Sequence, residues 1–124
     1  MEDAGADSLS LVNTLLGLAI DVRTRRPILG NITGGFAGPA IKPVALRMVW
    51  QVAKAVNIPV SGLGGIMTGI DAIEFMMAGA DTVQIGTANI IDPNAMERIA
   101  DEMDEWCDKN GVKDIQEIVG TLKA

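Results

Sequence analysis

The fold is decided by the stretch Ile58-Pro59-Val60-Ser61-Gly62-Leu63-Gly64-Gly65-Ile66. Its first four residues are mostly apolar and end at a small polar side chain, as strands do when both faces of a sheet are buried. A glycine-rich turn follows, and Thr68-Gly69-Ile70-Asp71 then predicts the start of a helix, because Thr and Asp at this spacing can cap each other's amides. Gly79 is expected to end that helix. Strand, turn and helix in this order predict one unit of a parallel β/α sheet.

Two more strands of the same character are expected at 9–12 and 82–85, so that three parallel strands are predicted in all. Flanking helices are expected from Pro43 to about Val56, from Asp92-Pro93 to about Asn110 and, as a short last helix, from Asp114 onward. The fold class is therefore α/β. Because a closed eight-stranded β/α barrel needs about 250 residues, residues 1–124 are expected to form a single partial β/α-barrel domain.

Residues 15–41 do not fit this alternation of strand and helix. They hold five glycines, two prolines and the basic cluster Arg23, Arg25 and Arg26. The segment is too long for a simple turn between a strand and a helix, so it is expected to be a functional loop or to carry a small hairpin of its own. We interpret the arginines as a solvent-exposed face, with an anion site as the alternative.

Composition narrows the classes of function. Of the 124 residues 48% are hydrophobic and the mean hydropathy is +0.29, which is enough to bury a core. The net charge of −6 and the pI near 4.4 argue against a nucleic acid partner, because no basic stripe can displace counterions. No apolar run reaches membrane-spanning length, and the first residues lack the pattern of a signal peptide. We expect a soluble, cytoplasmic protein without membrane contact.

The side chains offer little for catalysis. Cys107 is the single cysteine and there is no histidine, so no internal disulfide, zinc site or Cys/His pair can be assembled. The acidic residues Asp101, Glu102, Asp104 and Glu105 are interpreted as the outward side of a helix whose inner side holds Met103 and Trp106, and not as a metal cluster. Cys107 lies late in the same helix and is interpreted as an ordinary packed or partly exposed residue. No catalytic and no metal-binding residue is predicted.

Two segments of small residues follow consecutive strands. Gly64 and Gly65 come after the second strand, and Gly86 and Thr87 come after the third. Small residues let backbone amides approach an anion closely at a helix N-terminus, and barrels hold phosphate groups after their last two strands in this way. The alternative is that these glycines only form tight turns.

A third candidate segment, Asn13-Thr14, ends the first strand at the same edge of the sheet. Its carboxamide and hydroxyl groups offer donors and acceptors to a polar planar ligand, although such pairs also serve as turns or helix caps. The glycine-rich segment 34–39 could bring its backbone against a flat ring, and a flexible loop is the equally good alternative.

Five motifs, taken together, resemble the C-terminal half of the dihydroorotate dehydrogenase family. They are Leu11-Val12-Asn13-Thr14, Gly34-Gly35-Phe36-Ala37-Gly38-Pro39-Ala40, Lys42-Pro43-Val44-Ala45-Leu46-Arg47, the stretch 58–66 quoted above, and Gly86-Thr87-Ala88-Asn89. Their order and spacing agree over essentially the whole chain. Within the family, the Lys42–Arg47 motif and the tail 106–122 most resemble the class 1B, NAD-linked catalytic subunit.

This resemblance implies the C-terminal portion of a TIM (β/α)8 barrel, a flavoprotein oxidoreductase that binds FMN and oxidises dihydroorotate to orotate in pyrimidine biosynthesis. It also implies an iron-sulfur and FAD partner subunit that passes electrons to NAD, and we expect a homo-oligomer. The roles that it implies for single residues are the FMN phosphate site at Gly64, Gly65, Gly86 and Thr87, approach to the flavin at Gly38, flavin lining at Val12, and substrate hydrogen bonds at Asn13 and Thr14.

The resemblance also implies what the matched segment lacks. In the family the catalytic-loop cysteine and the flavin-contacting lysine precede this segment, and Cys107 does not match the catalytic position. We therefore expect that this chain alone does not turn over dihydroorotate. Two other classes stay open: a portion of another phosphate-binding barrel enzyme, and a non-catalytic half-barrel that self-associates to cover its open sheet edges.

Overall fold

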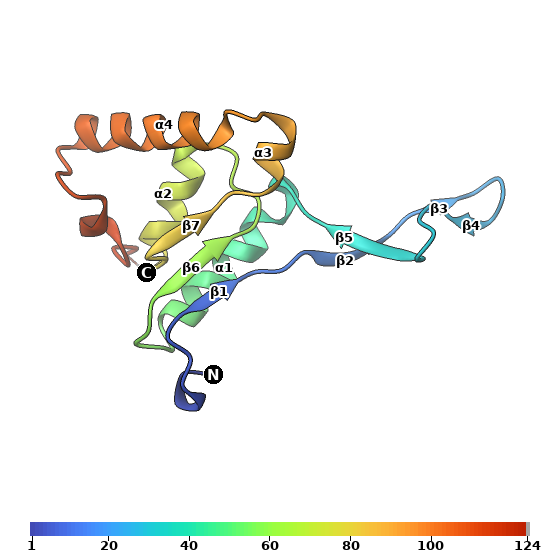
Figure 1. The fold of residues 1–124 in the computed structure, drawn as a ribbon, viewed down its shortest axis with the longest axis horizontal. Helices are drawn as coiled ribbons and strands as arrows, with labels where there is room; N and C mark the ends of the chain where they lie inside the picture. Colours follow the sequence, from blue (N-terminus) through green and yellow to red (C-terminus); the bar gives the residue numbers. More distant parts are fainter. Residues whose placement is uncertain (124) are drawn as a thin grey trace.

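Three parallel strands form the central sheet, as the sequence predicts (Figure 1). The computed structural model describes residues 1–123. The strands are β1 (Leu9–Leu11), β6 (Val60–Leu63) and β7 (Thr82–Gln84), in the order β1-β6-β7. Leu9 pairs with Val60, and Ser61 pairs with Thr82. The middle strand begins at Val60 and not at Ile58, and its first amide donates to the side chain of Asp81 at 2.8 Å.

Helices cover one face of this sheet and bury the core against it. They are α1 (Lys42–Ala53), α2 (Gly69–Met77), α3 (Thr87–Ile91) and α4 (Ala95–Asn110), with short 3-10 helices at η1 (Glu2–Ala4), η2 (Pro39–Ile41) and η3 (Ile115–Ile118). Val49 of α1, Phe75 of α2 and Ile99 of α4 are fully buried together with Val60 of β6. The apolar positions expected on these helices thus form one core with the strands. No helix within residues 1–123 has both the length and the apolar character to cross a membrane.

The start of α2 has the predicted cap. The Thr68 hydroxyl oxygen accepts a hydrogen bond from the Asp71 amide at 3.2 Å, and the Asp71 carboxylate accepts one from the Thr68 amide at 3.0 Å. After the helix, Gly79 has φ of +112°, and a Cβ there would stand 2.6 Å from Ala53 Cβ. The predicted capping pair at the start of α2 and the predicted glycine at its end are therefore both confirmed.

Two helix boundaries and the type of one helix differ from expectation. The helix expected from Asp92-Pro93 begins at Ala95, because the short helix α3 comes first and Asp92 accepts a hydrogen bond from the Asn94 amide at 3.0 Å in the connection. The last helix is a 3-10 helix, in which Asp114 accepts from the amide of Gln116 at 2.9 Å. Helix α1 has Pro43 in its first turn as expected and ends at Ala53, short of Val56.

Residues 15–36 carry a hairpin that extends away from the body (Figure 1). The strands β2 (Leu15–Leu18) and β5 (Thr33–Phe36) pair antiparallel, and β3 (Ile20–Asp21) and β4 (Arg26–Pro27) continue the arm. The three arginines of the basic cluster are exposed at its outer end, as the sequence analysis expected. This arm explains the length of the segment that separates β1 from α1.

Candidate functional site

A cavity of about 130 Å³ opens at the carboxyl ends of the three strands. Its walls come from the residues just after β1, β6 and β7, and from the segment that returns from the arm to α1. The lining residues are Val12, Thr14, Ala37, Gly38, Ile41, Leu63, Gly64, Gly65, Ile66, Gln84, Gly86 and Thr87. None of these side chains carries a charge, so any ligand here meets apolar groups, hydroxyls, one carboxamide and backbone dipoles.

Seven of the eight residues predicted for the site line this cavity, and the eighth lies beside it. The seven are Val12, Thr14, Gly38, Gly64, Gly65, Gly86 and Thr87. Asn13 lies in an adjoining hollow that Ser10, Val12, Thr14 and Leu63 also line. The structure therefore brings together segments that are separated by up to 75 positions in the sequence.

Asn13 makes a local hydrogen bond of the kind that its turn interpretation predicts. Its side-chain oxygen accepts from the Thr14 amide at 2.7 Å, and the residue remains exposed. The peptide bond between Leu11 and Val12, just before it, is cis. Asn13 is exposed and lines the adjoining hollow, where its carboxamide NH2 group can donate to a ligand.

Close packing explains the glycines after β6. Gly64 has φ of +130°, and a Cβ on it would stand 2.6 Å from Ala45 Cβ. Gly65 has φ of +83°, and a Cβ on it would stand 2.8 Å from both the Gly38 carbonyl oxygen and the Lys42 amide nitrogen. Positive φ and contact with backbone atoms both favour glycine, so these two residues are required by the turn itself, whatever the cavity holds.

Gly86 differs from the other glycines of the cavity. A Cβ on Gly86 would meet no atom within 4 Å, and its φ of −109° lies outside the left-handed region. Neither packing nor a positive φ therefore demands glycine at this position. A side chain here would instead extend into open space beside the cavity, which is the result expected when a glycine leaves room for a ligand.

The amides at the start of α2 are already bonded, which corrects one expectation. Asp71 accepts hydrogen bonds from the amides of Met67 at 2.9 Å and Thr68 at 3.0 Å, and Glu102 accepts one from the amide of Gly69 at 2.5 Å. The sequence analysis expected the N-terminus of this helix to face an anion. Two side-chain carboxylates occupy that position instead, so an anion in the cavity would meet the preceding residues of the turn.

Partial burial alone would raise the pKa of Asp71, but the Lys42 ammonium and the Met67 amide together hold it below its usual value. Lys42 Nζ lies 2.6 Å from Asp71 and 2.9 Å from Glu74, and these hydrogen bonds raise the pKa of Lys42. The amide of Gly69, assisted by Arg98, lowers the pKa of Glu102. The Lys42 ammonium group is thus paired with two carboxylates, and Lys42 does not line the cavity.

Comparison with known proteins agrees with this geometry. The family model described as dihydroorotate dehydrogenase matches residues 1–106. The chain belongs to the dihydroorotate dehydrogenase family. The chain is 65% identical over 121 residues to the catalytic subunit of dihydroorotate dehydrogenase B (NAD(+)) from Geobacter metallireducens, covering 98% of this chain and 40% of that protein. The protein of the same name from Bacteroides thetaiotaomicron is 59% identical over 122 residues, with the same coverage.

A solved structure agrees as well. The dihydroorotate dehydrogenase of Eimeria tenella, solved in complex with ferulenol, superposes with a TM-score of 0.80 and 28% identity over 97% of this chain and 32% of that one. The expected fold class, the C-terminal portion of a TIM barrel, is confirmed. The chain spans about two fifths of the length of the curated relatives it matches. Those relatives are named as catalytic subunits, which implies a separate partner subunit, and the family is flavin-dependent in general.

One polar side chain in the cavity of this family member was not predicted. The Gln84 carboxamide donates to Ser10 Oγ at 2.9 Å and to Ser61 Oγ at 3.0 Å, which ties the three strands together on the face that the helices leave uncovered. The signal was present in the sequence, because Thr82 and Gln84 alternate with apolar residues and so share one face of the strand. Gln84 belongs among the candidate binding residues, since it also lines the cavity.

The residues that the sequence analysis excluded as catalytic or metal-binding residues lie as expected, with one exception. Asp101, Asp104 and Glu105 are exposed on α4. Glu102 is only partly exposed and bonds to Gly69 and Arg98, so the interpretation of the whole run as an outward face was wrong at this position. Cys107 lies farther along α4 and is absent from the cavity lining, and burial followed by the nearby carboxylates raises the pKa of its thiol.

Proposed function

We propose that residues 1–124 are the FMN-phosphate end of an enzyme that oxidises dihydroorotate to orotate in pyrimidine biosynthesis, and that they form a single partial barrel domain. The observation that carries this proposal is the uncharged cavity at the carboxyl ends of β1, β6 and β7, with an unobstructed glycine at position 86. Phosphate groups in barrels bind at this end of the last strands.

The size and lining of the cavity suit a phosphate group. A dry cavity of about 150 Å³ holds one benzene molecule. The cavity here, at about 130 Å³, can therefore take a phosphoryl group and the adjoining chain but not a three-ring flavin. We assign the phosphate to the backbone amides of Gly64, Gly65, Gly86 and Thr87, together with the Thr87 hydroxyl. Gly38 and Val12, which line the same cavity, would contact the flavin ring.

We place the substrate in the adjoining hollow. Val12, Thr14 and Leu63 line both the cavity and the hollow, so a ligand in one space would lie directly beside a ligand in the other. The exposed carboxamide of Asn13 and the hydroxyl of Thr14 are suited to the carbonyl and N–H groups of a pyrimidine ring. The proposed phosphate and substrate sites are therefore neighbours whose walls share Val12, Thr14 and Leu63.

The roles of this chain are binding and orientation. When bound, FMN supplies the hydride-accepting chemistry of the reaction. Among the described residues, the cavity lining contains no Asp, Glu, Lys or Cys that could take a proton from the substrate. We therefore propose that the isolated chain does not turn over dihydroorotate, and that proton transfer belongs to residues outside it. Electron transfer to NAD would pass through an iron-sulfur and FAD subunit, in a cytoplasmic homo-oligomeric complex.

The test compares FMN with riboflavin, which lacks the phosphate. Quenching of flavin fluorescence by the purified chain gives the two affinities, and we expect FMN to bind tighter by about tenfold or more, because a charged group gains about 1.5–3 kcal/mol from one hydrogen bond. Gly86→Val should abolish this preference, since it fills the space beside the cavity. Equal affinities for the two flavins in the unmodified chain would refute the phosphate assignment. Turnover of dihydroorotate by the purified chain would refute the proposed inactivity.

A second candidate function is a non-catalytic half-barrel that self-associates. The arm favours it, because eight large apolar side chains on the arm are between 44% and 83% exposed. They are Leu16, Leu18, Ile20, Val22, Ile28, Leu29, Ile32 and Phe36. Several large apolar side chains exposed on one segment are typical of a protein interface. A monomer with FMN affinity would favour the first function, whereas an oligomer without flavin affinity would favour the second.

A further inference from the structure

The turn between β6 and α2 is held from outside by two helices. Just beyond the cavity-lining residues, the amides of Met67, Thr68 and Gly69 donate to Asp71 of α2 and Glu102 of α4 at 2.5 to 3.0 Å. The Met67 carbonyl oxygen accepts a hydrogen bond from Arg98 Nη2 at 3.2 Å. Both backbone groups of Met67, a half-buried residue, are therefore bonded to side chains.

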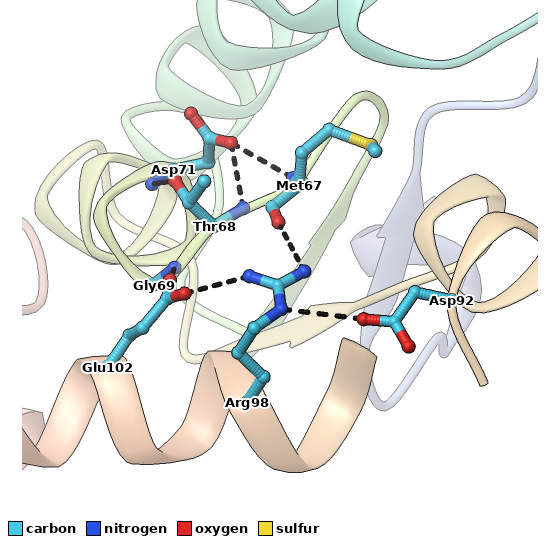
Figure 2. A network of polar contacts seen from close by, with 7 residues as sticks. All are labelled: Met67, Thr68, Gly69, Asp71, Asp92, Arg98 and Glu102. Carbon is cyan, nitrogen blue, oxygen red and sulfur yellow. Dashed lines mark hydrogen bonds and ion pairs between the residues drawn. The ribbon is translucent and has the colours of Figure 1, made fainter. Parts of the chain in front are cut away.

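Arg98 joins this turn to the connection that follows α3 (Figure 2). Its Nε lies 3.5 Å from Asp92 Oδ2, in the connection that follows α3, and α3 begins at Thr87 of the cavity. Its Nη1 donates to Glu102 at 2.7 Å, one turn along α4. One guanidinium group thus contacts Met67, next to the first glycine segment, and Asp92, at the end of the helix that begins in the second, and Glu102 orients it.

The geometry of these contacts depends on the shape of the guanidinium group. Arginine presents its donors in a rigid plane, so three partners in three directions fix its position and in turn fix theirs. A lysine at this position keeps the charge but offers one nitrogen, which cannot reach Met67, Asp92 and Glu102 together. The side chains of Arg98 and Asp92 are each 41% exposed, so the ion pairs alone are weak and positioning is the larger effect.

We propose that Arg98, oriented by Glu102, is a positioning residue that sets the spacing between the two glycine segments, so that both can bind one phosphate group. This inference rests on the proposed function. Arg98 itself does not line the cavity. Its effect on the ligand is indirect and acts through Met67 on one side and Asp92 on the other.

The experiment compares Arg98→Lys and Arg98→Ala with Lys109→Ala, a control on the same helix whose ion pair with Glu105 at 3.0 Å lies far along α4 and is well exposed. The first readout is the ratio of riboflavin to FMN dissociation constants. We expect both Arg98 variants to lose about tenfold in this ratio, comparable with the loss when the hydrogen-bond partner of a metal ligand is removed. Riboflavin affinity should hardly change, and the control should behave like the unmodified chain.

The second readout needs no ligand. Amide hydrogen exchange should become faster in the Arg98 variants at residues 64–69 and 86–92, and remain unchanged in the strands. A purely structural role predicts lower thermal stability with an unchanged flavin ratio and unchanged exchange at these two segments, and that result would overturn the proposal. If the unmodified chain binds neither flavin, the proposed function fails, while the exchange data still decide whether Arg98 holds the two segments. If Arg98→Ala does not fold, Arg98→Lys still tests the proposal.

Discussion

The carbonyl oxygen of Gly38 lies 2.8 Å from the position that a Cβ on Gly65 would occupy. The segment that returns from the arm therefore packs directly on the turn after β6, backbone against backbone. Val12 lies on the other side of the same turn, with its Cγ2 3.2 Å from the corresponding position on Gly64. The cavity is formed by this close approach of three backbone segments, which bulkier residues would prevent.

Substitution of alanine should separate the two kinds of glycine in the site. Gly65→Ala places a methyl group against backbone atoms at a positive φ, and we expect it to lower the free energy of unfolding by about 2 kcal/mol or more. Gly86→Ala places a methyl group in open space and should cost less than about 1 kcal/mol while weakening FMN binding. Urea unfolding and flavin titration of both variants check this. If Gly65→Ala has the same free energy of unfolding as the unmodified chain, the turn does not require glycine at position 65.

Acid should weaken the capped start of α2. The folded-state pKa values of Asp71 and Glu102 are lowered, so the stability that these carboxylates provide is fully present above their unfolded values of 3.8 and 4.5 and is lost as the pH falls through the folded values. The free energy of unfolding should therefore fall between about pH 5 and pH 3. Asp71→Asn should show a shallower fall than the unmodified chain, and Asp101→Asn, on the exposed face of α4, should follow the unmodified chain. An equally steep fall in Asp71→Asn would remove Asp71 as the cause.

Cys107 should react slowly with thiol reagents. Its raised pKa leaves less thiolate at neutral pH than a free thiol has, and the thiolate is the reactive form. Alkylation by iodoacetamide, followed by mass spectrometry against glutathione as the reference, should be slower for the protein. Cys107→Ser should leave FMN affinity unchanged because the residue lies outside the cavity lining. Rapid alkylation that FMN prevents would contradict both statements.

The arm should make the chain associate at high concentration. Leu16 and Val22 are 83% and 82% exposed, and replacing both with lysine should shift the sedimentation profile toward the monomer. Ile70→Lys, at a 51% exposed position on α2, is the matched control and should change the profile little. Identical profiles for the arm variant and the unmodified chain would exclude the arm as the associating surface.

Local signals in the sequence were enough for the sheet, the caps of α2 and the glycine segments of the cavity, whereas the roles of Val12 and Gly38 came from the family resemblance. The strands and glycine turns could be predicted because short apolar runs and positive-φ positions constrain nearby residues. The helix α3 was missed, since Thr87-Ala88-Asn89-Ile90-Ile91 continues an apolar strand without a helical stripe. The contact of Glu102 with Gly69 was missed because it joins residues 33 positions apart, and no local pattern encodes such a pair.

The uncharged lining of the cavity has a consequence for how the site tolerates mutation. Backbone amides are common to every amino acid except proline, so a donor set made of them survives nearly any substitution at the same positions. Such a site is lost by obstruction, when a larger side chain enters the space, and only rarely by deletion of a donor. Alanine at these positions therefore acts through the methyl group that it adds to a glycine, whereas proline is the substitution that removes a donor.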